Sequence, residues 1–408
     1  MDLKLIYGEN ADLKFYENRI AEMEKVFLEK EGYPSKYVFS SSGRAEILGN
    51  HTDHNHGFVM VASISCDIVA AVSERDDTIV KVCSLGYPDV VVDISDLSIK
   101  EEEFSTSNAL VRGVAKALTD RGFKFKGFTA YTTSNIFKGA GVSSSAAFEV
   151  LVTEIFNYIY LNGAISLVER ANISQYAENV YFNKPCGLLD QNGISTGSLI
   201  KLDFNVPTSP IITQMTPPKG YSLVITNTGG DHASLTEHYA AIRREMEEVA
   251  AHFGKKVLKD VPYDVFLKEV SVLKEKFSSR AILRSLHFYN ENERVLNAEK
   301  ALVSGDTKAF LKEVNESGIS SIALLQNCYV PGETNQPVVL GIELSRAIIK
   351  DGAVRVHGGG FAGSILAFVN DNEVDAYVEK MQEVFGNENV FKANIRKIGT
   401  TIIKENKY

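Results

Sequence analysis

One segment of the chain has the composition of a phosphate-binding turn. Residues 139–147 read Gly-Ala-Gly-Val-Ser-Ser-Ser-Ala-Ala and stand between a predicted strand and a predicted helix. Glycines let backbone amides turn inward, and a helix start offers unpaired N–H groups at the positive end of its dipole. A helix N-cap after a flexible turn would look similar, but three consecutive serines favour a phosphate cradle. The Gly-Lys-Ser/Thr of a Walker loop does not follow.

A second segment concentrates imidazole and carboxylate side chains. Residues 43–56 read Gly-Arg-Ala-Glu-Ile-Leu-Gly-Asn-His-Thr-Asp-His-Asn-His and contain three of the eight histidines. His and Asp side chains are suitable metal ligands. Asn, Asp, His and Arg on one loop are equally suited to a sugar, because several short polar groups can converge on its hydroxyls. A polar loop that caps a strand is the third interpretation, and the pattern alone leaves all three open.

Two acidic residues follow the phosphate-binding turn. Asp190 lies in Pro-Cys-Gly-Leu-Leu-Asp-Gln, residues 185–191, and Glu178 lies on a predicted helix before it. A lone Asp after an apolar run is usually a turn or cap residue. Two acids near a phosphate cradle, however, are typical of Mg²⁺ ligation and alcohol activation.

A glycine cluster joins two predicted strands near the end of the chain. Residues 357–363 read His-Gly-Gly-Gly-Phe-Ala-Gly. Four glycines in seven positions predict that the backbone here closely approaches another backbone segment or a ligand. The segment is therefore either a tight hairpin or a loop that lies along a sugar and a terminal phosphate.

Helices and strands are predicted in blocks, which favours the α+β class over a doubly wound sheet. Residues 205–220, rich in Pro and Thr, predict the crossover between an N-terminal domain, 1–208, and a C-terminal domain, 209–408. The predicted strands are 37–41, 58–73, 78–84, 89–94, 126–133, 221–227, 353–357, 364–369 and 393–403. The predicted helices are 13–31, 108–121, 143–161, 166–183, 235–253, 262–276, 278–303, 307–316, 336–350 and 372–385.

Composition excludes several classes of protein. The 408 residues include 43 Lys and Arg against 52 Asp and Glu, a net charge of −9, so we expect neither a nucleic-acid partner nor an anionic membrane. The four cysteines form no CxxC pair and are expected to be reduced, as is usual in the cytoplasm. No signal peptide is visible, and the longest apolar stretch, residues 57–72, is too short and polar to span a bilayer.

Four motifs, in the same order, resemble the GHMP small-molecule kinases and, within them, the galactokinases. GRAEILGNHTDHN at 43–55 is similar to GRVNLIGEHTDYN, and GAGVSSSAAFEV at 139–150 is similar to GxGLSSSASxEV. PCGLLDQ at 185–191 is similar to CGIMDQ, and RVHGGGFAGS at 355–364 is similar to RMTGGGFGGC. The resemblance extends over nearly the whole chain.

The resemblance implies a two-domain α+β fold with its active site in the cleft between the domains. The N-terminal domain would be similar to ribosomal protein S5, and the C-terminal domain would be a ferredoxin-like α/β sandwich. It also implies ATP, Mg²⁺ and phosphorylation of a sugar at its anomeric hydroxyl. In the family the histidine-rich segment binds sugar hydroxyls, which argues against a metal there.

Residue roles carry over by motif. Asp190 would act on the anomeric hydroxyl, with Arg44 beside it as the second catalytic residue. Mg²⁺ would be held by Glu178 with Ser144 or Ser145. The ATP phosphates would contact Gly139, Ala140, Gly141, Val142, Ser143, Ser144 and Ser145. The sugar would contact Arg44, Asn50, His51, Asp53, Gly187, Asp190 and Tyr239.

The departures from the family pattern fall mainly at the sugar end. Asn50 replaces a Glu that is expected to accept a hydrogen bond from the primary hydroxyl, His54 replaces a Tyr, and His357 replaces a Thr; Ser42 replaces a Pro. Asn both donates and accepts hydrogen bonds, so greater tolerance of galacturonate is expected here.

The expected reaction is therefore ATP plus galactose to galactose 1-phosphate and ADP, catalysed by a cytoplasmic monomer or weak homodimer. The alternatives are a related kinase for N-acetylgalactosamine, galacturonate or arabinose, a non-catalytic galactose sensor, and a metallohydrolase. The intact run from Ser143 to Ser145 disfavours the sensor.

Overall fold

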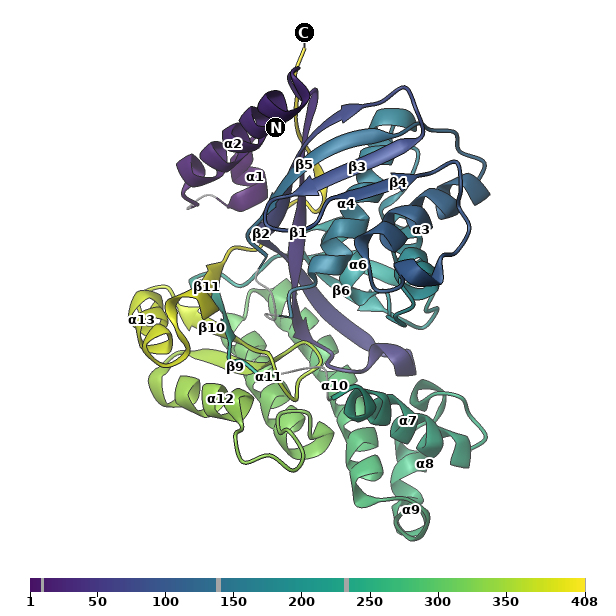
Figure 1. The fold of residues 1–408 in the computed structure, drawn as a ribbon. Helices are drawn as coiled ribbons and strands as arrows, with labels where there is room; N and C mark the ends of the chain where they lie inside the picture. The colour runs from purple at the N-terminus through teal and green to yellow at the C-terminus, as the bar shows by residue number, and fades with distance from the viewer. Residues whose placement is uncertain (9–10, 137–140, 231–234, 408) are drawn as a thin grey trace.

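The computed structural model describes residues 1–8, 11–136, 141–230 and 235–407, and it consists of two β-sheets flanked by helices (Figure 1). This confirms the mixed α+β class. The first sheet has the order β12-β1-β2-β5-β3-β4, with β6 paired to β2 and β7 paired to β6. Its strands are β1 (Tyr37–Leu48), β2 (Phe58–Glu74), β3 (Ile79–Ser84), β4 (Val90–Asp93), β5 (Phe128–Ser134), β6 (Leu199–Asp203), β7 (Ile211–Met215) and β12 (Thr401–Glu405).

Both faces of the central strands of the first sheet are buried. Alternate residues of a strand point to opposite faces, so Val38 packs with Phe27 of α2 (Leu13–Glu31), whereas Phe39 packs on the face that carries α4 (Ser144–Tyr160). Helix α1 (Leu3–Tyr7) joins α2 on its face. Helices α3 (Ser107–Asp120), α5 (Leu167–Tyr176) and α6 (Leu189–Thr196) pack with α4. Two-sided burial explains why β2 reads as a long apolar run, whereas β1 buries several polar side chains, among them Ser40, Arg44 and Glu46.

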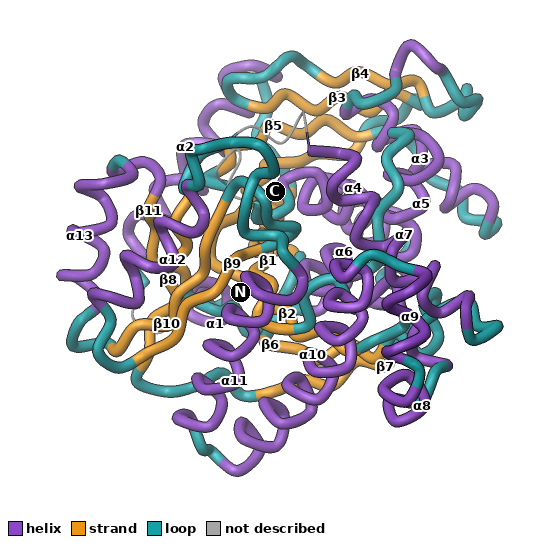
Figure 2. Tube along the Cα trace, turned by 90° about the horizontal axis from the view of Figure 1, so that it is seen from below, coloured by secondary structure: helices purple, strands orange, loops and turns teal. Residues whose placement is uncertain are grey.

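The second sheet is antiparallel, in the order β11-β8-β10-β9. Its strands are β8 (Tyr221–Asn227), β9 (Gly352–His357), β10 (Ser364–Asn370) and β11 (Val390–Ala393). Helices α12 (Pro337–Ile348) and α13 (Val374–Phe385) cover one face, and α10 (Ser279–Ser304) and α11 (Thr307–Ser320) cover the other (Figure 2). Helices α7 (Thr236–His252), α8 (Tyr263–Lys268) and α9 (Val270–Lys276) form a further cluster against α10. Within the described ranges, no helix is long and apolar enough to cross a membrane.

The structure differs from the sequence predictions at three segments that bear on the site and on the domain division. The strand predicted at 37–41 continues to Leu48, so the first half of the 43–56 segment is strand and not loop. The strand predicted at 393–403 is two strands, β11 and β12, which belong to different sheets, and the backbone of Ile395 and Arg396 between them is hydrogen-bonded to β2 and to Ser198. The predicted crossover 205–220 contains β7, which extends the first sheet.

The domain division at residue 208 stays a prediction. Strands β7 and β12 follow that residue in the chain and yet pair with strands of the first sheet. We propose that the N-terminal domain also includes these two strands.

A buried carboxylate ties the ends of the chain to the first sheet. Asp67 on β2 accepts hydrogen bonds from Tyr7 Oη at 2.6 Å, Ser40 Oγ at 2.5 Å and Arg19 Nη1 at 2.7 Å. Arg396 Nη1 lies 3.6 Å from the same carboxylate, and neither of these two side chains reaches solvent. Burial, followed by the charge of Asp67, raises the pKa of Tyr7 well above its ordinary value and keeps this donor protonated.

Asp67→Asn should lower the free energy of unfolding by about 3–5 kcal/mol, because two buried guanidinium groups lose their counter-charge. Urea unfolding followed by circular dichroism measures this. Asp375→Asn, at an exposed position in the first turn of α13, is the control and should cost no more than about 1 kcal/mol, because it removes only an interaction with the helix dipole. An unchanged unfolding midpoint for Asp67→Asn would contradict the structural role of this cluster.

Candidate active site

The centre of the site is an ion pair between Arg44 of β1 and Asp190 in the first turn of α6. Arg44 Nε lies 2.7 Å from Asp190 Oδ1, and Arg44 Nη2 lies 3.0 Å from Asp190 Oδ2. This two-point contact fixes the orientation of the carboxylate. The arginine side chain is 9% exposed and the aspartate side chain 32% exposed, so the carboxylate remains accessible to a ligand.

The described part of the phosphate turn is held against this ion pair. Arg44 donates to the Gly141 carbonyl through Nη1 and to the Val142 carbonyl at 3.2 Å through its backbone N–H. Ser143 has a left-handed φ of 62° and donates its hydroxyl hydrogen bond to Asp190. Helix α4 begins at the next residue, so its positive end adjoins the carboxylate. Gly139 and Ala140, also predicted to contact phosphate, lie outside the described residues.

Ser145 and Glu178, the predicted Mg²⁺ ligands, lie together. Ser145 Oγ donates to Glu178 Oε1 at 3.1 Å. Glu178 is presented by a π-helical turn, Ala177–Tyr181, that continues α5. Such turns occur frequently at functional sites. Lys184 Nζ also lies 2.9 Å from Glu178 Oε1.

A second carboxylate stands beside Glu178. Gln191 Nε2 donates to Glu178 Oε2 at 3.0 Å and to Glu149 Oε1 at 2.8 Å. Glu149 Oε2 is buried and has no hydrogen-bond partner in the described structure. Burial, with a further contribution from Glu178, raises the pKa of Glu149 well above its ordinary value.

These donors fit Mg²⁺ bound together with a nucleotide. The described residues contain no group of three or more His, Cys, Asp or Glu side chains arranged to hold a metal ion. Mg²⁺, however, is usually bound by one or two carboxylates together with substrate phosphates and water. The Glu178 carboxylate and the Ser145 hydroxyl supply two such oxygens at the start of α4.

A polar cavity of about 230 Å³ opens beside Asp190. Its wall includes five of the predicted sugar ligands, Asn50, His51, Asp53, Gly187 and Asp190, together with Glu46, His54, Cys186, Leu189 and Gly359. Gly359 comes from the β9–β10 turn, so both sheets contribute to the cavity. A side chain at position 187 would displace the Asp53 carboxylate, because a Cβ there would lie 2.6 Å from Asp53 Oδ2.

The histidine-rich turn sets the charge of this cavity. Burial alone would raise the pKa of Asp53, but His54, whose Nδ1 lies 2.9 Å from its Oδ1, and His51 lower it to about 2. Burial, reinforced by His54, lowers the pKa of His51 to about 3, so its ring is neutral at neutral pH. Its Nε2 is 2.9 Å from the Gly359 carbonyl and therefore donates to it. His54 Nε2 is buried without a hydrogen-bond partner among the described residues.

Two predicted sugar ligands are engaged with the protein itself. Asn50 is fully buried, and its Nδ2 donates to Glu46 Oε1 at 2.7 Å and to the Gly358 carbonyl at 2.8 Å. Tyr239 donates to the Gly360 carbonyl at 2.8 Å, and burial raises its pKa to about 12. Tyr239 is not among the described residues that line the cavity. Sugar contacts by Asn50 and Tyr239 stay predictions.

Sequence reasoning missed Glu46, which lines the cavity. The signal lay in the motif GRAEILGNHTDHN, which has Glu at 46 and Asn at 50 where the family motif has Asn and Glu. The two side chains have exchanged places, and they contact each other.

Sequence reasoning also missed a second cavity, of about 270 Å³. Its wall includes Ser144 and Ser145 at the start of α4. The rest of the wall is largely apolar and comes from separate segments, among them Ile68, Leu85, Tyr87, Leu110, Phe148 and Phe182. No local motif marks such a set.

Comparisons with known proteins show the family of the chain. Residues 25–74 match the galactokinase galactose-binding signature, and residues 109–198 match the GHMP kinases N terminal domain. A galactokinase of Actinobacillus pleuropneumoniae is 32% identical over 354 residues, 86% of this chain and 89% of that protein. A galactokinase of Glaesserella parasuis serovar 5 is 32% identical over 358 residues, 85% of this chain and 88% of that protein.

Solved structures agree as well. The structure of Lactococcus lactis galactokinase complexed with galactose has a TM-score of 0.80 and 25% identity, and the match covers 93% of this chain and 98% of that one. Methanococcus jannaschii mevalonate kinase has a TM-score of 0.63 at 12% identity over 88% of this chain and 98% of that one, which shows the shared fold. From its motifs, its site and these matches, the chain belongs to the galactokinase family of the GHMP kinases.

Proposed function

We propose that this protein transfers the γ-phosphoryl group of ATP to the anomeric hydroxyl of galactose, giving galactose 1-phosphate and ADP. The observation that carries the proposal is the position of Asp190. Its carboxylate is fixed by Arg44, lines a polar cavity and accepts a hydrogen bond from Ser143 at the start of α4. An acceptor alcohol in the cavity would therefore lie between a base and a phosphate-binding helix end.

The nucleotide is proposed to occupy the second cavity and the start of α4. Ser144 and Ser145 belong to both. A nucleotide whose adenine ring occupied the apolar cavity would therefore have its phosphates at the N-terminus of the helix. Ser145 and Glu178 would hold Mg²⁺ there, and Glu149 lies behind them. When bound, Mg²⁺ would neutralise part of the negative charge of the phosphates.

Catalysis would consist of positioning and electrostatic stabilisation. Phosphoryl transfer passes through a loose transition state, so little covalent chemistry falls to the protein. Asp190 would accept the proton of the sugar hydroxyl, and Arg44 would keep the carboxylate in place. The cytoplasmic location and the monomeric or weakly dimeric state stay predictions.

Asp190→Asn should lower kcat at least ~100-fold, because it removes the base and keeps the shape of the side chain. Galactose affinity, measured by calorimetry, should stay within about one order of magnitude, since Asn retains hydrogen-bonding capacity. Asp375→Asn on the exposed side of α13 is the matched control. Near-normal turnover of Asp190→Asn would remove this residue from the catalytic role.

Glu178→Gln should raise the Mg²⁺ concentration for half-maximal rate, because a carboxylate ligand is replaced by an amide. Initial rates over a Mg²⁺ series at fixed ATP and sugar measure this, and galactose affinity should not change. Glu379→Gln, at an exposed position of α13, is the control. A change in galactose affinity without a change in Mg²⁺ dependence would show that the metal assignment is wrong.

A further inference from the structure

The polar cavity contains three carboxylates, and one of them has no role in the proposed reaction. Asp190 is engaged by Arg44, and Asp53 is engaged by His54. The third, Glu46, lies on β1 two residues after Arg44, so both side chains project from the same face of the strand.

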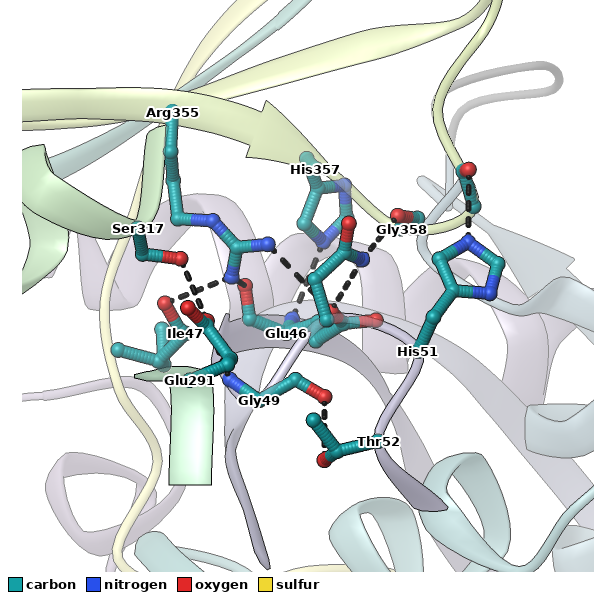
Figure 3. Close-up of polar contacts among 12 residues, drawn as sticks. Glu46, Ile47, Gly49, His51, Thr52, Glu291, Ser317, Arg355, His357 and Gly358 are labelled. Carbon is teal, nitrogen blue, oxygen red and sulfur yellow. Dashed lines mark hydrogen bonds and ion pairs between the residues drawn. The ribbon is translucent and has the colours of Figure 1, made fainter. Parts of the chain in front are cut away.

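The carboxylate of Glu46 is held through one of its two oxygens (Figure 3). Oε1 accepts from Asn50 Nδ2 at 2.7 Å and lies 3.5 Å from Arg355 Nη2. The Glu46 backbone N–H donates to His357 Nε2 at 3.2 Å, which fixes the strand at this point. Within the described part of the chain, no hydrogen bond to Oε2 is present. The side chain is 8% exposed and lines the cavity, so the free oxygen is available to a ligand there.

Asn50, by contrast, has both amide protons occupied. One is donated to Glu46 and the other to the Gly358 carbonyl. Its Oδ1 accepts from Asn327 Nδ2 at 2.7 Å, and no part of the residue is exposed. Asn50 therefore connects the glycine turn to Glu46, which is a positioning role.

We propose that Glu46 is the specificity-determining carboxylate of the cavity, accepting a hydrogen bond from a sugar hydroxyl at the C4–C6 end, and that Asn50 positions it. The inference rests on the proposed function, because Asp190 at the anomeric hydroxyl defines which end of the sugar approaches Glu46. The exchange of Glu and Asn between positions 46 and 50 thus keeps one carboxylate and one amide in the site. A carboxylate at this end repels a C6 carboxylate, so galacturonate should be a poor substrate, which is the opposite of the expectation from Asn50 alone.

Glu46→Gln tests the hydrogen bond. We expect KM for galactose to rise at least ~10-fold with kcat little changed, because a charge-assisted bond to substrate is replaced by a neutral one. The loss should disappear with either 4-deoxygalactose or 6-deoxygalactose, which lacks the partner hydroxyl, and should persist with 2-deoxygalactose. An equal loss with all three deoxy sugars, or no loss with galactose, would overturn the assignment.

The charge is tested separately with galacturonate. Glu46→Gln should raise the ratio of kcat/KM for galacturonate to that for galactose at least ~10-fold, since the repelling carboxylate is gone. An unchanged ratio would overturn the proposal. Glu154→Gln is the matched control, because Glu154 is a buried acid of α4 paired with Arg170 and is not among the residues that line the cavity.

Two further measurements keep the outcome interpretable. Glu46→Asp retains the charge and withdraws it by one methylene, so it should show the same pattern across the deoxy sugars even if Glu46→Gln does not fold. Turnover of galactose by the wild-type protein tests the proposed function by itself. If the wild type phosphorylates none of these sugars, galactose binding by calorimetry still reports whether Glu46 contacts the sugar, and equal affinity of wild type and Glu46→Gln would overturn the inference.

Discussion

The two-point contact between Arg44 and Asp190 is the constraint on which the site depends. It joins the middle of β1 to the first turn of α6, two segments separated by 146 positions in the sequence. The third nitrogen of the same guanidinium group donates to Gly141, so the start of α4 is located by the same side chain. Because a guanidinium group is planar and rigid, the Asp190 carboxylate, the turn before α4 and strand β1 take up one fixed arrangement.

A second buried network fixes the sugar side of the site to the other sheet. The Gly49 N–H donates to Glu291 Oε1 at 3.0 Å, and Arg355 Nη1 donates to the Ile47 carbonyl at 2.8 Å (Figure 3). Burial alone would raise the pKa of Glu291, but His287, Arg294 and Arg355 lower it to about 2, so this carboxylate stays ionised. The end of β1 is therefore held by charged groups from α10 and β9, and the cavity keeps its shape between the two sheets.

The carboxylates of the site form two sets, one at the start of α4 and one in the polar cavity. Around the phosphate turn, Lys184 pairs with Glu178, and a divalent cation would be shared between this carboxylate and the nucleotide phosphates. In the cavity, Asp53 is made acidic by neighbouring histidines, whereas burial raises the pKa of Glu46 despite the opposing effects of Arg355 and Asn50. A neutral sugar with hydroxyl donors is compatible with such a set of acceptors.

The sequence by itself determined the chemistry of this protein, because its motifs are local. The serine-rich turn had to begin a helix, and α4 begins at Ser144. Asp190 and Glu178 were recognisable as the two acids near that turn, and Ser145, one of the two serines expected to share Mg²⁺ with Glu178, donates a hydrogen bond to it. The tertiary structure alone decided which polar groups remain available to a ligand. Asn50 and Glu46 both line the cavity, but the amide of Asn50 is hydrogen-bonded to Glu46, Gly358 and Asn327, a set of contacts that only the packing of distant segments creates. The second cavity and the division of the last predicted strand between two sheets likewise arise from contacts between distant segments. Hydrogen-bond satisfaction and burial are properties of the packed chain, and no local pattern of residues encodes them.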